Sequence, residues 1–219
     1  MWTQYFNEVF TPVNSKYKEL ALNTLKSSSG IKDIFAVRGF ENTLTENLNE
    51  IPIVKQFNTA LQNEDFFGST SSALEIYNKS INENLVEISV STRMRNSLIN
   101  ALSTDAQILI NTYIGNAEVL PSSNAFITKA KYLGICLDLL KKDAFNYERL
   151  YMSQLFLEAY AIIRARNYSK YPEAKQKLKD ALKVEERAAY IHNALGIVLN
   201  HENNYKEAKY HYNRAKELI

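Results

Sequence analysis

The C-terminal third of the 219-residue chain contains a repeat with a period of 34 residues. Five positions carry the same residue type in both copies: Tyr171 and Tyr205, Glu173 and Glu207, Ala174 and Ala208, Lys175 and Lys209, and Ala181 and Ala215. A fixed period of roughly 20 to 50 residues is typical of proteins built from stacked supersecondary units. One such unit cannot bury its apolar face alone, so we expect the copies to share a continuous core.

The residues of the repeat predict helices joined by short turns. Apolar residues three and four positions apart indicate helices over 148–166, 173–184 and 188–199, and from 204 to the chain end. Pro172 suits a first helical turn, and Asn204 with Glu207 matches an N-cap and its partner. Because the turns are short, we expect two antiparallel hairpins.

The helical signal is weaker before residue 148. Ser123–Leu140 reads as one helix, whereas Leu85–Val90 alternates like a strand and is predicted helical only because helical patterns surround it. Capping boxes predict helix starts at Ser72 with Glu75 and at Thr104 with Gln107.

Residues 1–68 indicate several short helices. An aromatic and apolar stripe near the N-terminus is assigned to the core, with an exposed docking helix as the alternative; its members are Trp2, Tyr5, Phe6, Val9 and Phe10.

With only six Gly and four Pro in the chain, we predict an all-α fold. Residues 1–121 form an irregular helical region, which can hold degenerate repeats, and residues 122–219 form the repeats.

The last repeat resembles the tetratricopeptide repeat family. With Ala189 as the first repeat position, Leu195 and Gly196 fall at positions seven and eight, where that family prefers Leu and Gly. Further matches at family positions follow in the second helix: Tyr205, Ala208, Tyr212 and Ala215. The preceding copy departs from the family by having Ala161 and Ile162 in place of the Leu-Gly pair. The resemblance covers about residues 155–219 and implies hairpins stacked as a right-handed superhelix, an α-solenoid.

The same resemblance implies a concave groove lined by the first helix of each repeat. The positions that match the groove of the family are Phe156, Ile163, Arg166, Tyr190, Asn193, Ile197 and His201. Aromatic, aliphatic and amide groups together suit an extended or helical peptide. The alternative for Ile163 and Ile197 is packing between helices.

No catalytic or metal-binding constellation is visible in the sequence. His192, His201 and His211 lack the i,i+4 spacing of a helical zinc site, and Cys136 lies among apolar residues, which predicts a buried and inert thiol. Tyr205 and Tyr212 are expected to be internal, and glutamates interrupt the C-terminal lysines, which argues against nucleic-acid binding. We expect neither cofactor nor metal.

The charge is uneven along the chain. Residues 1–140 carry 11 Lys and Arg against 14 Asp and Glu, whereas residues 141–219 carry 15 against 10. A basic C-terminal region favours an acidic partner, and a solvated helix surface is the alternative.

The last repeat ends without a polar capping helix, so we expect an apolar face that further repeats, a partner or self-association would cover.

These observations predict a non-enzymatic scaffold or adaptor that binds a protein or peptide. One alternative is an accessory or regulatory repeat region of a larger, catalytic polypeptide. Another is an enzyme with a site in the N-terminal region. The chain starts without the cationic and apolar pattern of a signal peptide and has no apolar run of about 20 residues. We therefore expect no membrane insertion and a cytoplasmic location.

Overall fold

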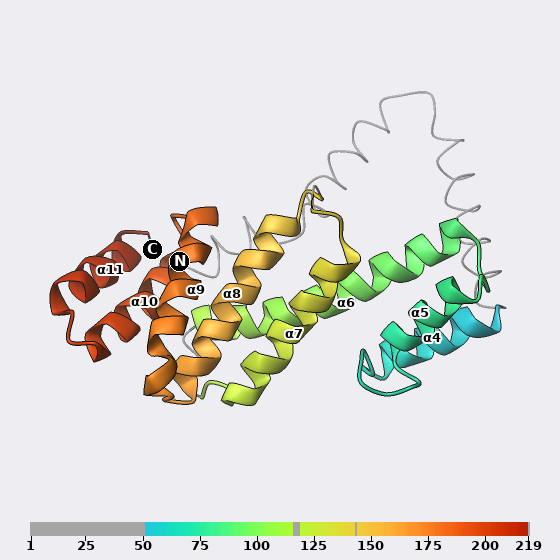
Figure 1. Ribbon diagram of the computed structural model, residues 1–219, viewed down its shortest axis with the longest axis horizontal. Coiled ribbons are helices and arrows are strands. Elements are labelled where there is room, and N and C mark those ends of the chain that lie inside the picture. Colours follow the sequence, from blue (N-terminus) through green and yellow to red (C-terminus); the bar gives the residue numbers. More distant parts are fainter. Residues whose placement is uncertain (1–50, 116–118, 143, 219) are drawn as a thin grey trace, which may run out of the picture. The chain divides into compact units, whose positions relative to one another are not determined.

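The computed structural model describes residues 51–115, 119–142 and 144–218. Within these ranges the secondary structure is helical, with no strand, which confirms the predicted all-α class for this part of the chain (Figure 1). The aromatic stripe over residues 2–10 and the short helices expected before residue 51 lie outside the described residues.

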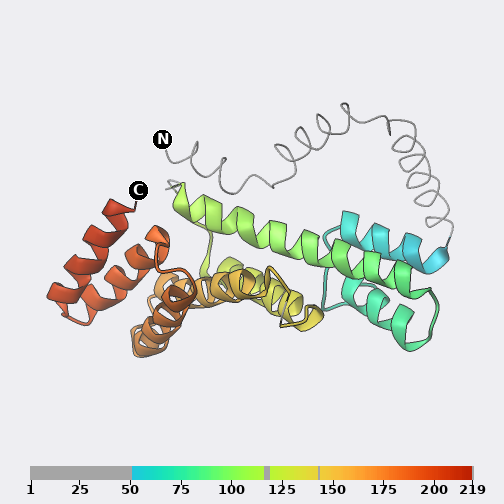
Figure 2. The same cartoon turned by 90° about the horizontal axis from the view of Figure 1, so that it is seen from above.

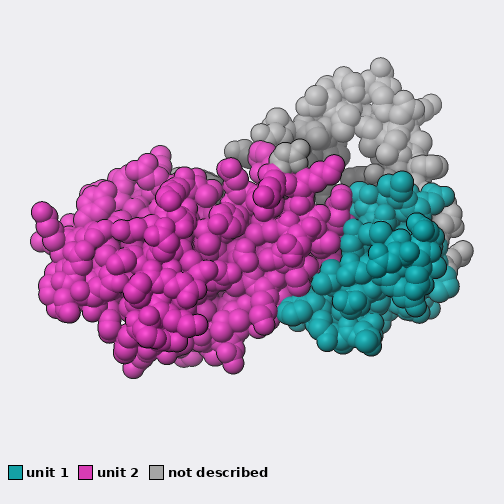
Figure 3. Space-filling view, in the orientation of Figure 1, with its two compact units in different colours: residues 1–94 teal, residues 95–219 magenta. Residues whose placement is uncertain are grey.

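The chain divides into two compact units, residues 1–94 and 95–219 (Figure 3). The division falls within α6 (Ile88–Ile114), whereas the sequence pattern placed it at residue 121. The helix start predicted at Thr104 and Gln107 is wrong, because both residues lie inside α6. No Gly or Pro occurs between residues 88 and 114, so nothing in the sequence ends the helix there. The helix predicted over Leu85–Val90 begins only at Ile88.

In the first unit, α4 (Pro52–Gln62) packs against α5 (Ala73–Asn82). The Ser72 hydroxyl accepts a hydrogen bond from the backbone N–H of Glu75 at 3.5 Å, which confirms the predicted start of α5. Phe57 is the most buried aromatic side chain of this unit among the described residues, with 1% of its surface exposed. These contacts define a small helical core that is separate from the repeat.

In the second unit, five α-helices and one short 3-10 helix follow α6 along the chain. They are α7 (Ser123–Leu139), α8 (Tyr147–Arg164), η1 (Tyr168–Lys170), α9 (Tyr171–Val184), α10 (Ala189–His201) and α11 (Tyr205–Glu217). From α7 to α11 each α-helix packs against the next, as the views in Figures 1 and 2 both show. The helices predicted between residue 123 and the chain end are therefore confirmed, with ends within two residues of those expected.

The small residues of the repeat lie where two helices approach closely. Ala174 and Ala181 of α9 are fully buried, and Ala208 of α11 is 2% exposed. A Cβ added to Gly196 would lie 2.6 Å from Cε1 of Tyr212, so only glycine lets this ring rest against α10. The recurring alanines and this glycine thus allow the helix axes to come together.

Candidate partner-binding surface

The structure separates the seven predicted groove residues into three groups. Phe156 and Ile163 are buried, with 0% and 7% of their surfaces exposed, so neither side chain is available to a partner. Tyr190 and Ile197 are half-buried. The exposed members are Arg166, Asn193 and His201. The groove assignment of Phe156 and Ile163 is therefore corrected to a core position, and the alternative of packing between helices holds for Ile163.

Tyr113, near the C-terminal end of α6, covers this part of the predicted groove. Its ring centroid lies 5.3 Å from that of Phe156 and 4.4 Å from that of Tyr160. Its hydroxyl accepts a hydrogen bond from Asn193 Nδ2 at 2.9 Å, and burial raises the pKa of Tyr113. The chain's own α6 thus occupies a place that the family resemblance implied for a partner.

Tyr190 takes part in the same aromatic cluster. Its ring meets Phe156 edge to face, with centroids 4.8 Å apart, a favourable geometry for aromatic pairs. Burial also raises the pKa of Tyr190, which keeps its hydroxyl protonated. Sequence reasoning missed the cluster because Tyr113 lies 80 residues before Asn193, outside the recognisable repeat.

The opposite end of α8 and α10 is more open. His201 stacks on Tyr168 with centroids 4.0 Å apart and an interplanar angle of 11°, and it meets Tyr171 at 4.9 Å. Tyr168 is 50% exposed, and Arg166 follows α8 in a left-handed conformation with φ of 53°. This end therefore presents an exposed guanidinium beside exposed ring surface, a combination suited to protein recognition.

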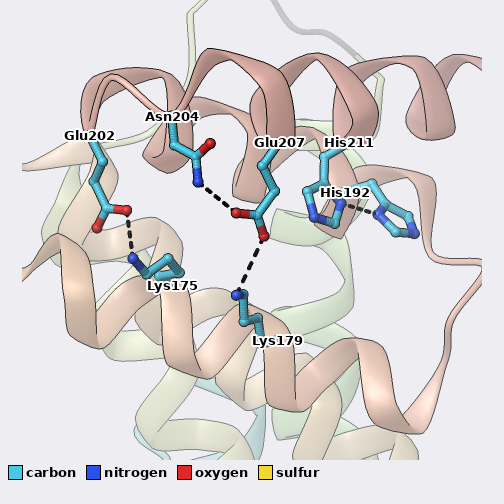
Figure 4. A network of polar contacts seen from close by, with 7 residues as sticks. All are labelled: Lys175, Lys179, His192, Glu202, Asn204, Glu207 and His211. Carbon is cyan, nitrogen blue, oxygen red and sulfur yellow. Dashed lines mark hydrogen bonds and ion pairs between the residues drawn. The ribbon is translucent and has the colours of Figure 1, made fainter.

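Ion pairs join α9 to the following hairpin, as Figure 4 shows. Lys175 Nζ lies 2.6 Å from Glu202 Oε2, and Lys179 Nζ lies 3.5 Å from Glu207 Oε1. Asn204 is the N-cap residue of α11, as predicted, but its side chain makes no capping hydrogen bond to the backbone. Its Nδ2 instead donates to Glu207 Oε2 at 2.7 Å, which holds the carboxylate toward α9.

A buried histidine pair links α10 to α11 (Figure 4). The Nδ1 atoms of His192 and His211 lie 2.8 Å apart, and His192 Nε2 lies 2.9 Å from the carbonyl oxygen of Glu186. Because a carbonyl only accepts, Nε2 of His192 donates; in a neutral ring Nδ1 is then the acceptor and His211 the donor. The spacing of these histidines in the sequence predicts separate residues without a metal, and it gives no signal for the pairing across the hairpin.

Because of this histidine pair, we expect the folded protein to lose stability on acidification. Burial, followed by the neighbouring His192, lowers the pKa of His211, while Glu207 and Lys179 are the other charged groups acting on it. Since the folded pKa is below the unfolded value of about 6.5, the unfolded state takes up its proton first. The stabilisation is therefore complete above the unfolded pKa. It is lost as the pH falls from the unfolded pKa through the lower pKa of the folded state.

Urea unfolding at about pH 7.5 and about pH 5.5 measures this effect, because the window spans the unfolded histidine pKa. The midpoint of the wild type should fall over this range more than that of His211→Gln, which has no titrating ring at this position. Parallel pH dependence in the two proteins would argue against a role for the pair.

The exposure of side chains along α11 differs from what the repeat register predicts. Tyr205, predicted to be internal, is 62% exposed. Polar side chains are also exposed along α11, among them Lys206, Lys209, Asn213 and Lys216. The outer side of the described part of α11 is therefore mixed: the exposed rings of Tyr205 and Tyr210 lie among polar side chains, in place of the continuous apolar face that an uncapped repeat predicts.

The first unit contains a shallow pocket of about 620 Å³ between α4, α5 and their connection. Lys55, Glu75 and Lys79 are among the charged residues of its lining, which includes no His or Cys. Asp65 at its edge accepts hydrogen bonds from the hydroxyls of Ser69 and Ser71. These two hydrogen bonds fasten the loop between α4 and α5 to the Asp65 carboxylate.

Cys136 is buried, as predicted. Its thiol donates to the carbonyl oxygen of Ile99 at 3.6 Å, and burial raises its pKa to about 12. The thiolate, which is the reactive form, is thus disfavoured. Across the described ranges, no three His, Cys, Asp or Glu side chains form a group that could hold a metal ion.

Among the described helices, none combines the length and apolar character needed to cross a bilayer.

Comparisons with protein-family models, curated proteins and solved structures found no match.

Proposed function

We propose that this chain is a non-enzymatic helical-repeat module that binds a protein or peptide. The observation that carries the proposal is the repeated burial of small residues at the 34-residue interval. Ala174 and Ala208 are 0% and 2% exposed, and Ala181 and Ala215 are 0% and 7% exposed. Burial of matched positions supports treating α8–α9 and α10–α11 as two tetratricopeptide-type hairpins, a design whose usual role is to present extended binding surfaces.

The binding surface we propose is the open end of α8 and α10. It consists of Arg166, Tyr168 and His201, with half-buried Ile197 beside them on α10. The guanidinium can pair with a carboxylate or stack on a ring, and the parts of the stacked Tyr168 and His201 rings that remain exposed offer contact area.

Capture experiments with the immobilised full chain test this function. The variant Arg166→Glu/His201→Ala should lose proteins that the wild type captures from a lysate, because it removes a cation and a ring from the proposed surface. Lys206→Glu on α11 is the control for an unrelated charge change, and it should capture the same proteins as the wild type. Equal capture by the double variant, or no capture by the wild type, would contradict the proposal.

A further inference from the structure

In the first hairpin, α8–α9, the helix that follows in the chain, α10, packs against α9. Tyr171 at the start of α9 is 4% exposed because His201 of α10 and Tyr168 of η1 lie against its ring. Tyr205 occupies the matched position at the start of α11 and is 62% exposed. The same residue type is thus covered in one hairpin and open in the next.

The matched lysines show the same difference. Lys175 of α9 pairs with Glu202 at 2.6 Å, whereas the described ion pairs include no partner for Lys209, its counterpart 34 residues later. Lys216 of α11, which matches Leu182 of α9, is also outside these ion pairs. The terminal helix therefore carries cationic groups that are not neutralised within the described structure.

These positions lie together along α11. Helical spacing places five side chains on one stripe, which we name the C-terminal face: Tyr205, Lys209, Tyr212, Asn213 and Lys216. Tyr212 is half-buried against Gly196, and the other members are exposed. The matching stripe of α9 has Leu178 and Leu182 in place of Tyr212 and Lys216, so the C-terminal face is more polar than its covered counterpart.

We infer that the C-terminal face docks an amphipathic helix of another polypeptide that carries a carboxylate at its C-terminal end. This carboxylate pairs with Lys209 as Glu202 pairs with Lys175, and a planar side chain beside it covers Tyr205 as His201 covers Tyr171. The chain's own α10 with Glu202 is the template for this partner. The inference rests on the repeat register of the proposed function but uses a different surface from Arg166 and His201.

Charge argues against a second copy of α11 as the occupant. Two C-terminal faces placed against each other would bring Lys209 and Lys216 of both copies together, and like charges at an interface are unfavourable. A helix with a terminal carboxylate instead brings an opposite charge to Lys209. The two tyrosines then supply contact area at low conformational cost, since each has only two rotatable side-chain angles.

Binding of a synthetic peptide to the full chain tests the inference. The probe is residues 187–204 of this sequence, synthesised with a helix-stabilising staple, and binding is followed by isothermal titration calorimetry. We expect Lys209→Glu to weaken binding by about five- to tenfold. A Glu202→Lys peptide should bind the wild type weakly and regain affinity for the Lys209→Glu protein.

Two controls separate this surface from others. Lys206→Glu makes the same charge change on the same helix outside the C-terminal face, and it should bind the peptide as the wild type does. Arg166→Glu/His201→Ala should also retain peptide binding, so a failure of the proposed function is distinguishable from a failure here. The inference is overturned if the peptide does not bind or binds Lys209→Glu unchanged. It is also overturned if sedimentation shows a dimer of the chain that Lys209→Glu abolishes.

Discussion

Replacing Phe156 by alanine is expected to lower the free energy of unfolding by about 3–5 kcal/mol. The side chain is 0% exposed, and its ring lies within 5.7 Å, centroid to centroid, of Tyr113, Tyr160 and Tyr190. Truncation removes the transfer free energy of the ring and leaves a cavity between three helices, α6, α8 and α10. Urea unfolding followed by circular dichroism measures the change.

Phe145→Ala is the matched control for this substitution. Phe145 is fully exposed, so its truncation should leave the free energy of unfolding within about 0.5 kcal/mol of the wild type. If Phe156→Ala were equally neutral, the assignment of Phe156 to the core would be contradicted. The groove position first predicted for it would then regain support.

Replacing Ala208 by leucine should destabilise the protein by about 1–3 kcal/mol. Ala208 is 2% exposed and belongs to the same buried cluster as Leu195 and Leu199 of α10. A branched four-carbon side chain cannot enter this contact unless α10 and α11 move apart. The position therefore reports directly on how closely the two helices of the last hairpin approach.

The helices between residue 123 and the chain end could be predicted because their signal is local. Apolar spacing and the 34-residue repeat indicate both the helices and the buried alanines, and Ser72 with Glu75 marks the start of α5 from four adjacent positions. The length of α6 was missed because a capping-box pattern inside a helix looks the same as one at its start. Only the surrounding chain decides whether the helix continues.

The surface could be predicted only in part, because burial depends on neighbours that are distant in sequence. The burial of Phe156 requires Tyr113, which carries no repeat signature, and the pairing of His192 with His211 requires two helices to face each other. Tyr171 and Tyr205 make the limit clear, since the same residue type in the same register is covered in one copy and exposed in the other. Repeat position alone predicts which way a side chain points, whereas the neighbouring helix decides whether it is buried.

The measurement that tests the repeat register most directly is the urea unfolding of Ala208→Leu beside Lys209→Leu. These adjacent residues differ by one position on α11, and only Ala208 faces the core, while Lys209 is exposed. The register predicts a loss of about 1–3 kcal/mol for Ala208→Leu and a change within about 0.5 kcal/mol for Lys209→Leu. Equal stability of the two variants, or a larger loss for Lys209→Leu, would contradict it.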